Sequence, residues 1–242
     1  MNSPSPKMRA IITGASSGIG EATVLAFAKA GIDVALVSRS LDKLEAVAKD
    51  ARSRGVEAKA YQLDLSQLDR IVPSLEAIAA DFGEIDILVN NAGMGYTNSL
   101  KDTSLTDWQK VLDLNLTSVF QCVLGVLPKM RERGSGTIIN LASIAAATPF
   151  PDWGAYSVSK AGLVAFSKTL AAEERANGIR VMTISPGAVN TPIWDTETVQ
   201  ADFDRSGMLT PESVASVIVQ AALLPQEAVV EETILMPSAG AL

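Results

Sequence analysis

Histidine is absent from this chain of 242 residues, and cysteine occurs only once, as Cys122. Without histidine, neither a Ser–His–Asp nor a Cys–His mechanism can operate, and a histidine-ligated zinc site is impossible. A single cysteine supplies neither a thiolate metal cluster nor an internal disulfide, which is typical of a reducing compartment. Acid/base chemistry must therefore come from tyrosine, lysine, aspartate or glutamate, and we expect no metal site.

Clusters of basic residues are also lacking, and the formal net charge is −7. Nucleic-acid binding needs clustered lysine and arginine, so this balance disfavours it. The longest apolar stretches, such as 138–147, are interrupted and far shorter than the roughly 20 residues that span a bilayer. The first residues, MNSPSPK, have no apolar core of the kind found in secretory signals. We expect a cytoplasmic protein with no nucleic-acid or membrane partner.

Hydrophobic residues make up 48% of the chain and charged residues 19%, which indicates a packed globule. Short β-branched or apolar runs alternate with longer amphipathic ones. Strands are expected at 10–13, 34–38, 58–63, 85–90, 137–141, 181–185 and 233–236. Helices are expected at 18–30, 41–54, 68–82, 106–133, 153–177 and 211–224.

This alternation predicts an α/β fold of the Rossmann type, a doubly wound parallel sheet with helices on both faces. With right-handed crossovers, the seven strand candidates take the order 3-2-1-4-5-6-7. Thr106 stands where a helix cap is expected, and Gly31, Gly55 and Gly178 each follow a helical run, where a left-handed residue ends a helix. No linker or composition shift divides the chain, so residues 1–242 form one expected domain.

A glycine-rich turn follows the first expected strand, with the sequence Thr13-Gly14-Ala15-Ser16-Ser17-Gly18-Ile19-Gly20. Between a strand and a helix, such a turn lets the backbone approach a pyrophosphate, and the helix N-terminus supplies free N–H groups. The spacing is T-G-x-x-x-G-x-G rather than G-x-G-x-x-G. Glycines needed only to pack the helix on the strand are the alternative reading.

The end of the second expected strand bears on which dinucleotide binds. NAD sites usually offer a carboxylate there for the ribose hydroxyl, whereas an arginine accommodates the 2′-phosphate of NADP. In this chain Ser38 stands at the expected carboxylate position, and Arg39 follows it. The sequence favours NADP, although Arg39 could also be an ordinary solvated arginine.

Tyr156 and Lys160 lie four residues apart in an expected helix, so their side chains share one face. A free tyrosine has a pKa of about 10, and a nearby ammonium group stabilises the phenolate and lowers that value. Tyr-x-x-x-Lys pairs are also common on surface helices, so this pair alone decides nothing. Other candidate residues follow further strands or lie in the preceding helix: Asp64, Asn90, Asn91, Ser143, Asn115, Pro186, Gly187 and Thr191.

These elements together resemble the short-chain dehydrogenase/reductase family over residues 8–240, since the glycine turn, N-N-A-G, Ser143, Y-x-x-x-K and P-G occur in that family's order. The resemblance implies an NADP(H)-dependent oxidoreductase that interconverts a carbonyl compound and an alcohol. It implies that Tyr156 is the general acid/base and that Ser143 binds the carbonyl oxygen. It further implies that Lys160 holds the nicotinamide ribose and that the backbone carbonyl of Asn115 anchors a water connecting Lys160 to solvent.

The resemblance also implies the dinucleotide contacts. Asp64 would touch the adenine, Asn91 to Gly93 the ribose, and Thr191 the nicotinamide carboxamide. The full implied set is Gly14, Ser16, Ser17, Gly18, Ile19, Gly20, Arg39, Asp64, Asn91, Ala92, Gly93, Tyr156, Lys160, Pro186, Gly187, Val189 and Thr191.

Residues 190–209 correspond to the lid that members of this family place over the substrate. Trp153, Trp194, Met94, Phe150 and Phe203 are candidates for lining the substrate pocket, with simple burial as the alternative. The substrate is expected to be a small carbonyl compound or alcohol, and the chain a homo-oligomer, either a tetramer or a dimer.

Two other functions stay open. One is 3-oxoacyl-[acyl-carrier-protein] reductase, although the C-terminal stretch 231–242 carries Leu235-Met236-Pro237, whereas many such reductases have an Asp-Gly-Gly segment there. The other is a regulator that binds NADP and senses redox state without turnover.

Overall fold

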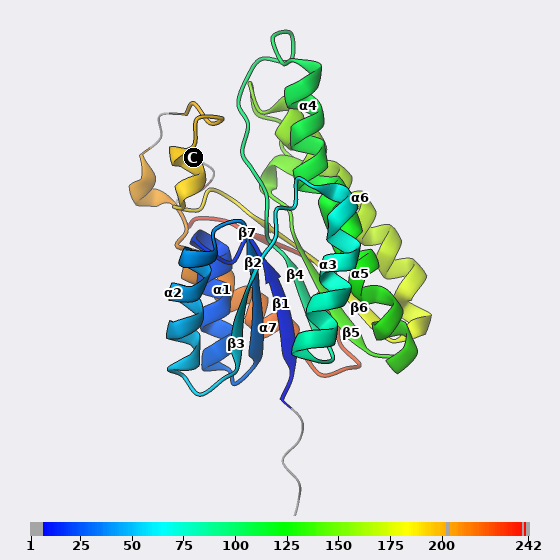
Figure 1. Ribbon diagram of the computed structural model, residues 1–242. Coiled ribbons are helices and arrows are strands. Elements are labelled where there is room, and N and C mark those ends of the chain that lie inside the picture. Colours follow the sequence, from blue (N-terminus) through cyan, green and yellow to red (C-terminus); the bar gives the residue numbers. More distant parts are fainter. Residues whose placement is uncertain (1–6, 202–203, 239, 241–242) are drawn as a thin grey trace, which may run out of the picture.

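The computed structural model describes residues 7–201, 204–238 and 240. Within this part of the chain, seven parallel strands form one sheet in the order β3-β2-β1-β4-β5-β6-β7, as the alternating pattern predicted (Figure 1). The strands are β1 (Arg9–Thr13), β2 (Asp33–Ser38), β3 (Ala58–Gln62), β4 (Ile87–Asn90), β5 (Gly136–Leu141), β6 (Ile179–Pro186) and β7 (Glu232–Leu235).

Helices cover both faces of this sheet (Figure 1). One face carries α1 (Gly18–Lys29), α2 (Leu41–Arg52) and α7 (Pro211–Ala222), with α1 packed between the other two. The opposite face carries α3 (Leu68–Phe82), α5 (Ser118–Arg133) and α6 (Gly154–Glu174). The short helix α4 (Leu105–Leu112) rises beyond the carboxyl ends of the strands. In such folds that edge is where ligands bind.

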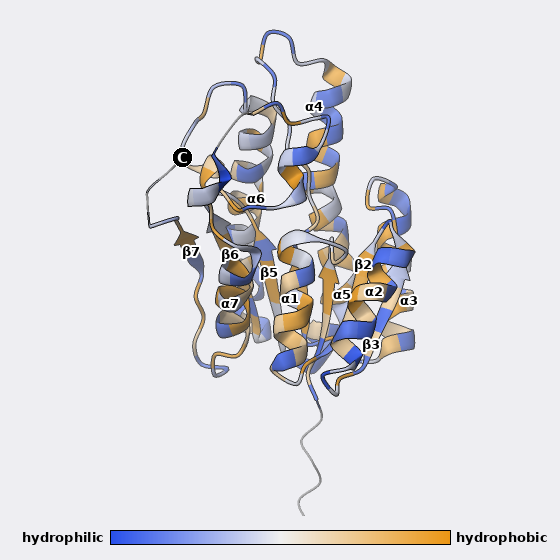
Figure 2. Ribbon diagram, turned by 90° about the vertical axis from the view of Figure 1, so that its left-hand side faces the viewer, coloured by the Kyte–Doolittle hydropathy of each residue, from blue (hydrophilic) through white to orange (hydrophobic). Residues whose placement is uncertain are grey.

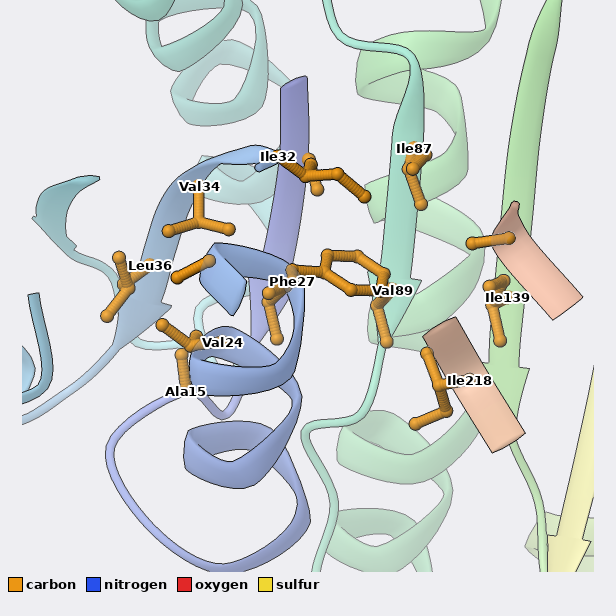
Figure 3. Packing of buried hydrophobic residues seen from close by; sticks show 14 of the residues in the cluster. Ala15, Val24, Phe27, Ile32, Val34, Leu36, Ile87, Val89, Ile139 and Ile218 are labelled. Carbon is orange, nitrogen blue, oxygen red and sulfur yellow. The ribbon is translucent and has the colours of Figure 1, made fainter. Parts of the chain in front are cut away.

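Buried aliphatic side chains fill the space between the sheet and each helical layer. Phe27 of α1 is completely buried beside Val89 of β4, and Ile218 of α7 packs against Ile139 of β5 (Figure 3). Figure 2 shows the hydrophobic residues concentrated in the strands, whereas hydrophilic residues colour much of α2 and α4. Each such large side chain stabilises the fold by about 1.5–3 kcal/mol, so these layers hold the strand ends rigidly in register.

The helix expected at 106–133 is present as one run, Leu105–Arg133, with a π-helical turn inside it. α4 ends at Leu112, a π-helical turn covers Asp113–Thr117, and α5 starts at Ser118. The N-cap of α4 is Ser104 rather than Thr106, because the Ser104 hydroxyl accepts a hydrogen bond from the Asp107 N–H at 3.0 Å. Apolar periodicity continues through the π-helical turn, so the sequence pattern does not reveal it.

Other boundaries follow the predictions closely. Gly31, Gly55 and Gly178 have φ values of +81°, +86° and +72°, as expected for residues that end helices. The helix expected at 153–177 is α6 followed by a 3₁₀ turn at Arg175–Asn177. By length and composition alone, 105–133 is apolar enough to cross a membrane, but its α5 part packs on α3 and the sheet, as core helices do.

Candidate active site

A cavity of about 1670 Å³ opens at the carboxyl edge of the sheet. Of the residues that sequence reasoning assigned to catalysis or to the dinucleotide, all but two line this cavity. The exceptions, Gly20 and Asn115, are buried behind the lining. We call its two parts the phosphate end (the Gly14–Gly20 turn, Arg39 and Asp64) and the carbonyl end (Ser143, Trp153, Tyr156, Lys160 and Trp194).

Glycines of the phosphate end stand where side chains have no room. A Cβ on Gly20 would lie 2.2 Å from the Gly14 carbonyl oxygen, and a Cβ on Gly14 would lie 2.8 Å from the Asn91 Nδ2. Gly14 also has a φ of +66°, a conformation that other residues rarely adopt. The turn is therefore packed tightly against its neighbours, and its backbone forms the surface of the cavity.

The start of α1 offers backbone donors to this surface. Ser17, the N-cap residue, makes no side-chain hydrogen bond to the first turn. The first N–H groups of a helix have no partner within it and carry partial positive charge. Together with the glycine backbone, they form an arrangement that suits a phosphate or pyrophosphate.

Asn91 and Thr13 join the glycine turn to the end of β4. The Thr13 hydroxyl accepts hydrogen bonds from the Asn91 and Ala92 N–H groups at 3.0 and 3.1 Å. The Asn91 side chain donates to the Thr13 and Gly14 carbonyls at 2.9 and 3.2 Å. Sequence reasoning quoted Thr13 as part of the motif but gave it no role, and these contacts show that it fixes the turn.

Arg39 and Asp64 lie at the outer part of the phosphate end, after β2 and β3. Arg39 is exposed, so its guanidinium is accessible from the cavity. Burial raises the pKa of Asp64, but hydrogen bonds from Ser66 and the positive charge of Arg39 outweigh that effect, so the pKa lies below its usual value. The carboxylate is therefore ionised at neutral pH, and its charge faces the guanidinium.

Tyr156 of α6 is the centre of the carbonyl end. Burial raises the pKa of its phenol, and a hydrogen bond with the Ser143 hydroxyl opposes that rise. Ser143 follows β5 and accepts a hydrogen bond from the Ala145 N–H at 3.1 Å, which fixes its rotamer. The two hydroxyls therefore converge on one place in the cavity, with the phenol protonated at neutral pH.

Lys160 lies one turn further along α6. Its Nζ donates to the Leu141 carbonyl at 2.8 Å and stands 5.8 Å from the centroid of the Tyr156 ring. Burial lowers the pKa of Lys160 to about 8. The pKa of Tyr156 lies above its usual value and Lys160 is not among the groups that shift it, so the lowering by Lys160 expected from the sequence is not found in the protein without cofactor.

Asn115, at the centre of the π-helical turn, is completely buried. Its side-chain oxygen accepts from the Met94 N–H at 2.8 Å, and its Nδ2 donates to the Met94 carbonyl and to Ser159 Oγ at 2.9 and 3.1 Å. Ser159 in turn donates to the Tyr156 carbonyl at 2.7 Å. These side-chain bonds connect the π-helical turn to α6, a link through Ser159 that sequence reasoning missed.

The expected lid contains a 3₁₀ turn, Pro192–Asp195, and packs over the carbonyl end. The Thr97 N–H donates to the Thr198 carbonyl at 2.9 Å, and the Thr198 hydroxyl donates to the Gly95 carbonyl at 2.8 Å. Met94, Phe150, Trp153 and Trp194 all line the cavity, whereas Phe203 lies outside the described residues. Ile144, Ile193 and Met236 also line it and were missed, because nothing in the local sequence distinguishes them from core residues.

Comparisons with known proteins agree with this architecture. The sequence model of the family described as short chain dehydrogenase matches residues 8–202. An uncharacterized oxidoreductase of Mycobacterium tuberculosis is 38% identical over 216 residues, which cover 87% of this chain and 62% of that protein. This chain thus spans less than two thirds of the length of that relative.

Two further proteins extend the comparison. A 3-oxoacyl-[acyl-carrier-protein] reductase of Staphylococcus epidermidis is 39% identical over 181 residues, 74% of each chain. An alcohol dehydrogenase from Thermococcus sibiricus, solved in complex with 5-hydroxy-NADP, superposes with a TM-score of 0.88 at 30% identity and covers 96% of this chain and 97% of its own.

Proposed function

This chain belongs to the short-chain dehydrogenase family, and we propose that it is an NADP(H)-dependent oxidoreductase that interconverts a carbonyl compound and an alcohol. One observation carries the proposal: the Tyr156 and Ser143 hydroxyls converge in the same cavity that the glycine turn and Arg39 line. The alcohol dehydrogenase from Thermococcus sibiricus, solved with an NADP derivative, supports the choice of cofactor.

The phosphate end fits a dinucleotide. Gly14 and Gly20 leave space that a Cβ would fill, and the uncapped start of α1 offers N–H donors to a pyrophosphate. Arg39 would pair with the 2′-phosphate, Asp64 would contact the adenine, and Thr191 the nicotinamide carboxamide. When bound, the dinucleotide supplies or accepts the hydride.

The remaining chemistry is acid/base work by this chain's own residues. In the direction of reduction, Tyr156 donates its proton to the carbonyl oxygen while Ser143 donates a hydrogen bond to the same oxygen and stabilises its developing charge. The raised pKa keeps Tyr156 protonated at neutral pH, the form that reduction needs. Lys160 would hold the ribose hydroxyls and would stabilise the phenolate that proton transfer leaves behind.

Three structural proposals accompany this function. Residues 1–242 form one domain with 190–209 as the substrate lid, and the protein acts in the cytoplasm.

We also propose a homo-oligomer, either a tetramer or a dimer. Phe120, Leu124 and Val158, which are 42%, 38% and 47% exposed on α5 and α6, give an apolar surface for a second copy. Light scattering at micromolar concentration should give a mass above that of the monomer, and a monomer alone would contradict the proposal.

NADPH absorbance with a panel of ketones, aldehydes and acetoacetyl thioesters tests the function. Oxidation of NADPH that depends on a carbonyl substrate is expected. The Staphylococcus relative favours a second candidate, reduction of a 3-oxoacyl thioester, and a preference for thioesters over all free ketones would identify it. NADPH binding without turnover of any carbonyl would instead support a redox-sensing regulator, against which the complete Ser143, Tyr156, Lys160 and Asn115 set argues.

A further inference from the structure

Three aromatic rings form a continuous wall at the carbonyl end. The Trp153 ring lies 5.2 Å from the Tyr156 ring at an interplanar angle of 72°. The Trp194 ring lies 5.8 Å from the Trp153 ring at 67°. Both pairs have the edge-to-face geometry that aromatic rings prefer, and both tryptophans line the cavity. The wall therefore begins at the acid/base hydroxyl and runs toward the lid.

The backbone around Trp153 is held in an unusual conformation. Asp152 has a φ of +64°, and it is the only residue other than glycine with a positive φ in the described part of the chain. The Asn98 N–H donates to the Asp152 carbonyl at 2.7 Å, and the Trp153 N–H donates to the Phe150 carbonyl at 3.3 Å. Residues held in such conformations cluster at functional sites, where the surrounding structure supplies the stabilisation.

Trp194 reaches the wall from the lid and is also anchored. Its indole N–H donates to the Val189 carbonyl at 2.8 Å, so the polar edge of the ring is satisfied and the rest of the ring is apolar surface. The hydrogen bonds from Thr97 and Thr198 hold the lid segment beside the loop that follows β4. Both tryptophans therefore have a fixed place relative to Tyr156 without a substrate to order them.

Positive charge is scarce near this wall. The cationic residues that line the cavity, within the described ranges, are Arg39, Lys110 and Lys160. Arg39 follows β2, which is three strand spacings from β5, or about 14 Å. Lys160 lies at the Tyr156 end of the wall, 5.8 Å from the centroid of that ring, and donates to the Leu141 carbonyl, whereas Lys110 is exposed on α4.

Negative charge near the wall is partly neutralised. Asp195 beside Trp194 pairs with Arg205. Away from Lys160, a carboxylate or phosphate placed against Trp153 and Trp194 would therefore meet apolar rings rather than the arginine or lysine that such groups need.

We propose that Trp153 and Trp194 determine specificity, and that the substrate carries an uncharged aromatic group adjacent to its carbonyl, which packs edge-to-face against this wall. The inference rests on the proposed function, because it takes Tyr156 as the point where the carbonyl oxygen binds. A ring on the substrate extends the existing series of edge-to-face contacts while the carbonyl reaches Tyr156 and Ser143.

Binding of ketones to the protein saturated with NADP⁺ tests this without turnover. Phenylacetone and cyclohexylacetone share one carbonyl and differ only in whether the ring is aromatic. Calorimetry should show phenylacetone binding about 2- to 10-fold more tightly. This is the range expected for the contact between two aromatic rings in addition to the effect of the surface area that they bury. Trp153→Leu and Trp194→Leu should each abolish that preference, whereas Trp153→Phe should retain it and guards against a folding defect.

Trp108→Phe is the matched control. Trp108 lies in α4, packs near Tyr96 and does not line the cavity. It should leave the preference unchanged. A second comparison tests charge: ethyl 3-oxobutanoate should show a higher kcat/KM than 3-oxobutanoate, its anionic counterpart.

Equal binding of the two ring ketones, or a preference for the anion, would overturn the inference and leave the proposed function intact. Failure of every carbonyl in the panel to oxidise NADPH would overturn the proposed function itself.

Discussion

The two ends of the cavity are built in different ways. At the phosphate end the glycine turn is packed so tightly that a Cβ added to Gly14 or Gly20 would lie only 2.8 or 2.2 Å from a neighbouring atom. At the carbonyl end the surface is side chains from α6 and from three loops, those after β4, β5 and β6. The first end tolerates few residue types, whereas the second can change its side chains while the fold is preserved. We therefore expect the phosphate end to determine the cofactor and the carbonyl end the substrate.

Loss of the Tyr156 hydroxyl should give the largest difference between the two ends, because it should lower turnover and leave NADPH binding almost unchanged. Tyr156→Phe removes the proton donor but keeps the ring against Trp153, so turnover should fall by a factor on the order of 10²–10⁴. NADPH affinity, which depends on the phosphate end, should change little. Steady-state kinetics and fluorescence titration with NADPH measure the two effects.

Tyr61→Phe is the matched control for this variant. The Tyr61 hydroxyl bonds Asp81 on the outer surface between β3 and α3, away from the cavity. It should leave turnover unchanged. Near-parent turnover in Tyr156→Phe would show that the acid/base group is elsewhere, among the aspartates and glutamates around the cavity.

Arg39 tests whether the phosphate end alone selects the cofactor. Arg39→Asp removes the proposed partner of the 2′-phosphate and offers an acceptor to the ribose hydroxyl of NADH. Losing a charged hydrogen bond costs about 1.5–3 kcal/mol, so the preference for NADPH should fall by about 10- to 150-fold and reverse.

Dissociation constants for both cofactors measure this preference. Arg54→Asp makes the same charge change just beyond the opposite end of α2 and should keep the preference. If the parent protein binds NADPH and NADH equally well, the assignment of Arg39 is wrong.

Gly20 tests the packing of the turn. Gly20→Ala places a Cβ 2.2 Å from the Gly14 carbonyl oxygen and must push the turn open. We expect a loss of about 1–3 kcal/mol in stability, together with weaker NADPH binding. Gly31→Ala is the control. The φ of +81° at Gly31 strains an alanine backbone there, but the added Cβ would meet no neighbouring atom within 4 Å. It should lower the melting temperature but leave NADPH affinity unaltered; equal NADPH affinity in both variants would contradict this account.

The same contrast explains how much the sequence could predict. Strand order follows from the alternation of strands and helices, and the glycine turn from its place between a strand and a helix. The π-helical turn at Asn115 could not be foreseen, since the apolar positions on either side keep helical spacing and the Asn115 side chain bonds to Met94 and Ser159, which are distant in the sequence. The aromatic wall likewise depends on Asp152 and Asn98, which come together only when two loops meet.

Lys160 of the carbonyl end is buried, and its burial leads to a prediction about the stability of the protein. Burial lowers its pKa to about 8 in the folded protein, whereas an unfolded chain keeps lysine protonated until about pH 10.4. Between these values the unfolded state binds more protons than the folded state, so stability rises with pH. Below pH 8 Lys160 is protonated in both the folded and the unfolded state, so burial of its ammonium group lowers the free energy of unfolding by the full amount.

Between pH 8 and pH 9 this difference should add about 1 kcal/mol to the free energy of unfolding of the protein without cofactor. Lys160→Met removes the titrating group and should abolish the gain, whereas Lys43→Met, at an exposed site on α2, should keep it. Urea unfolding at a series of pH values measures the three proteins in parallel. The same slope in all three would mean that the Lys160 ammonium is solvated rather than buried, and its placement against the Leu141 carbonyl would then need revision.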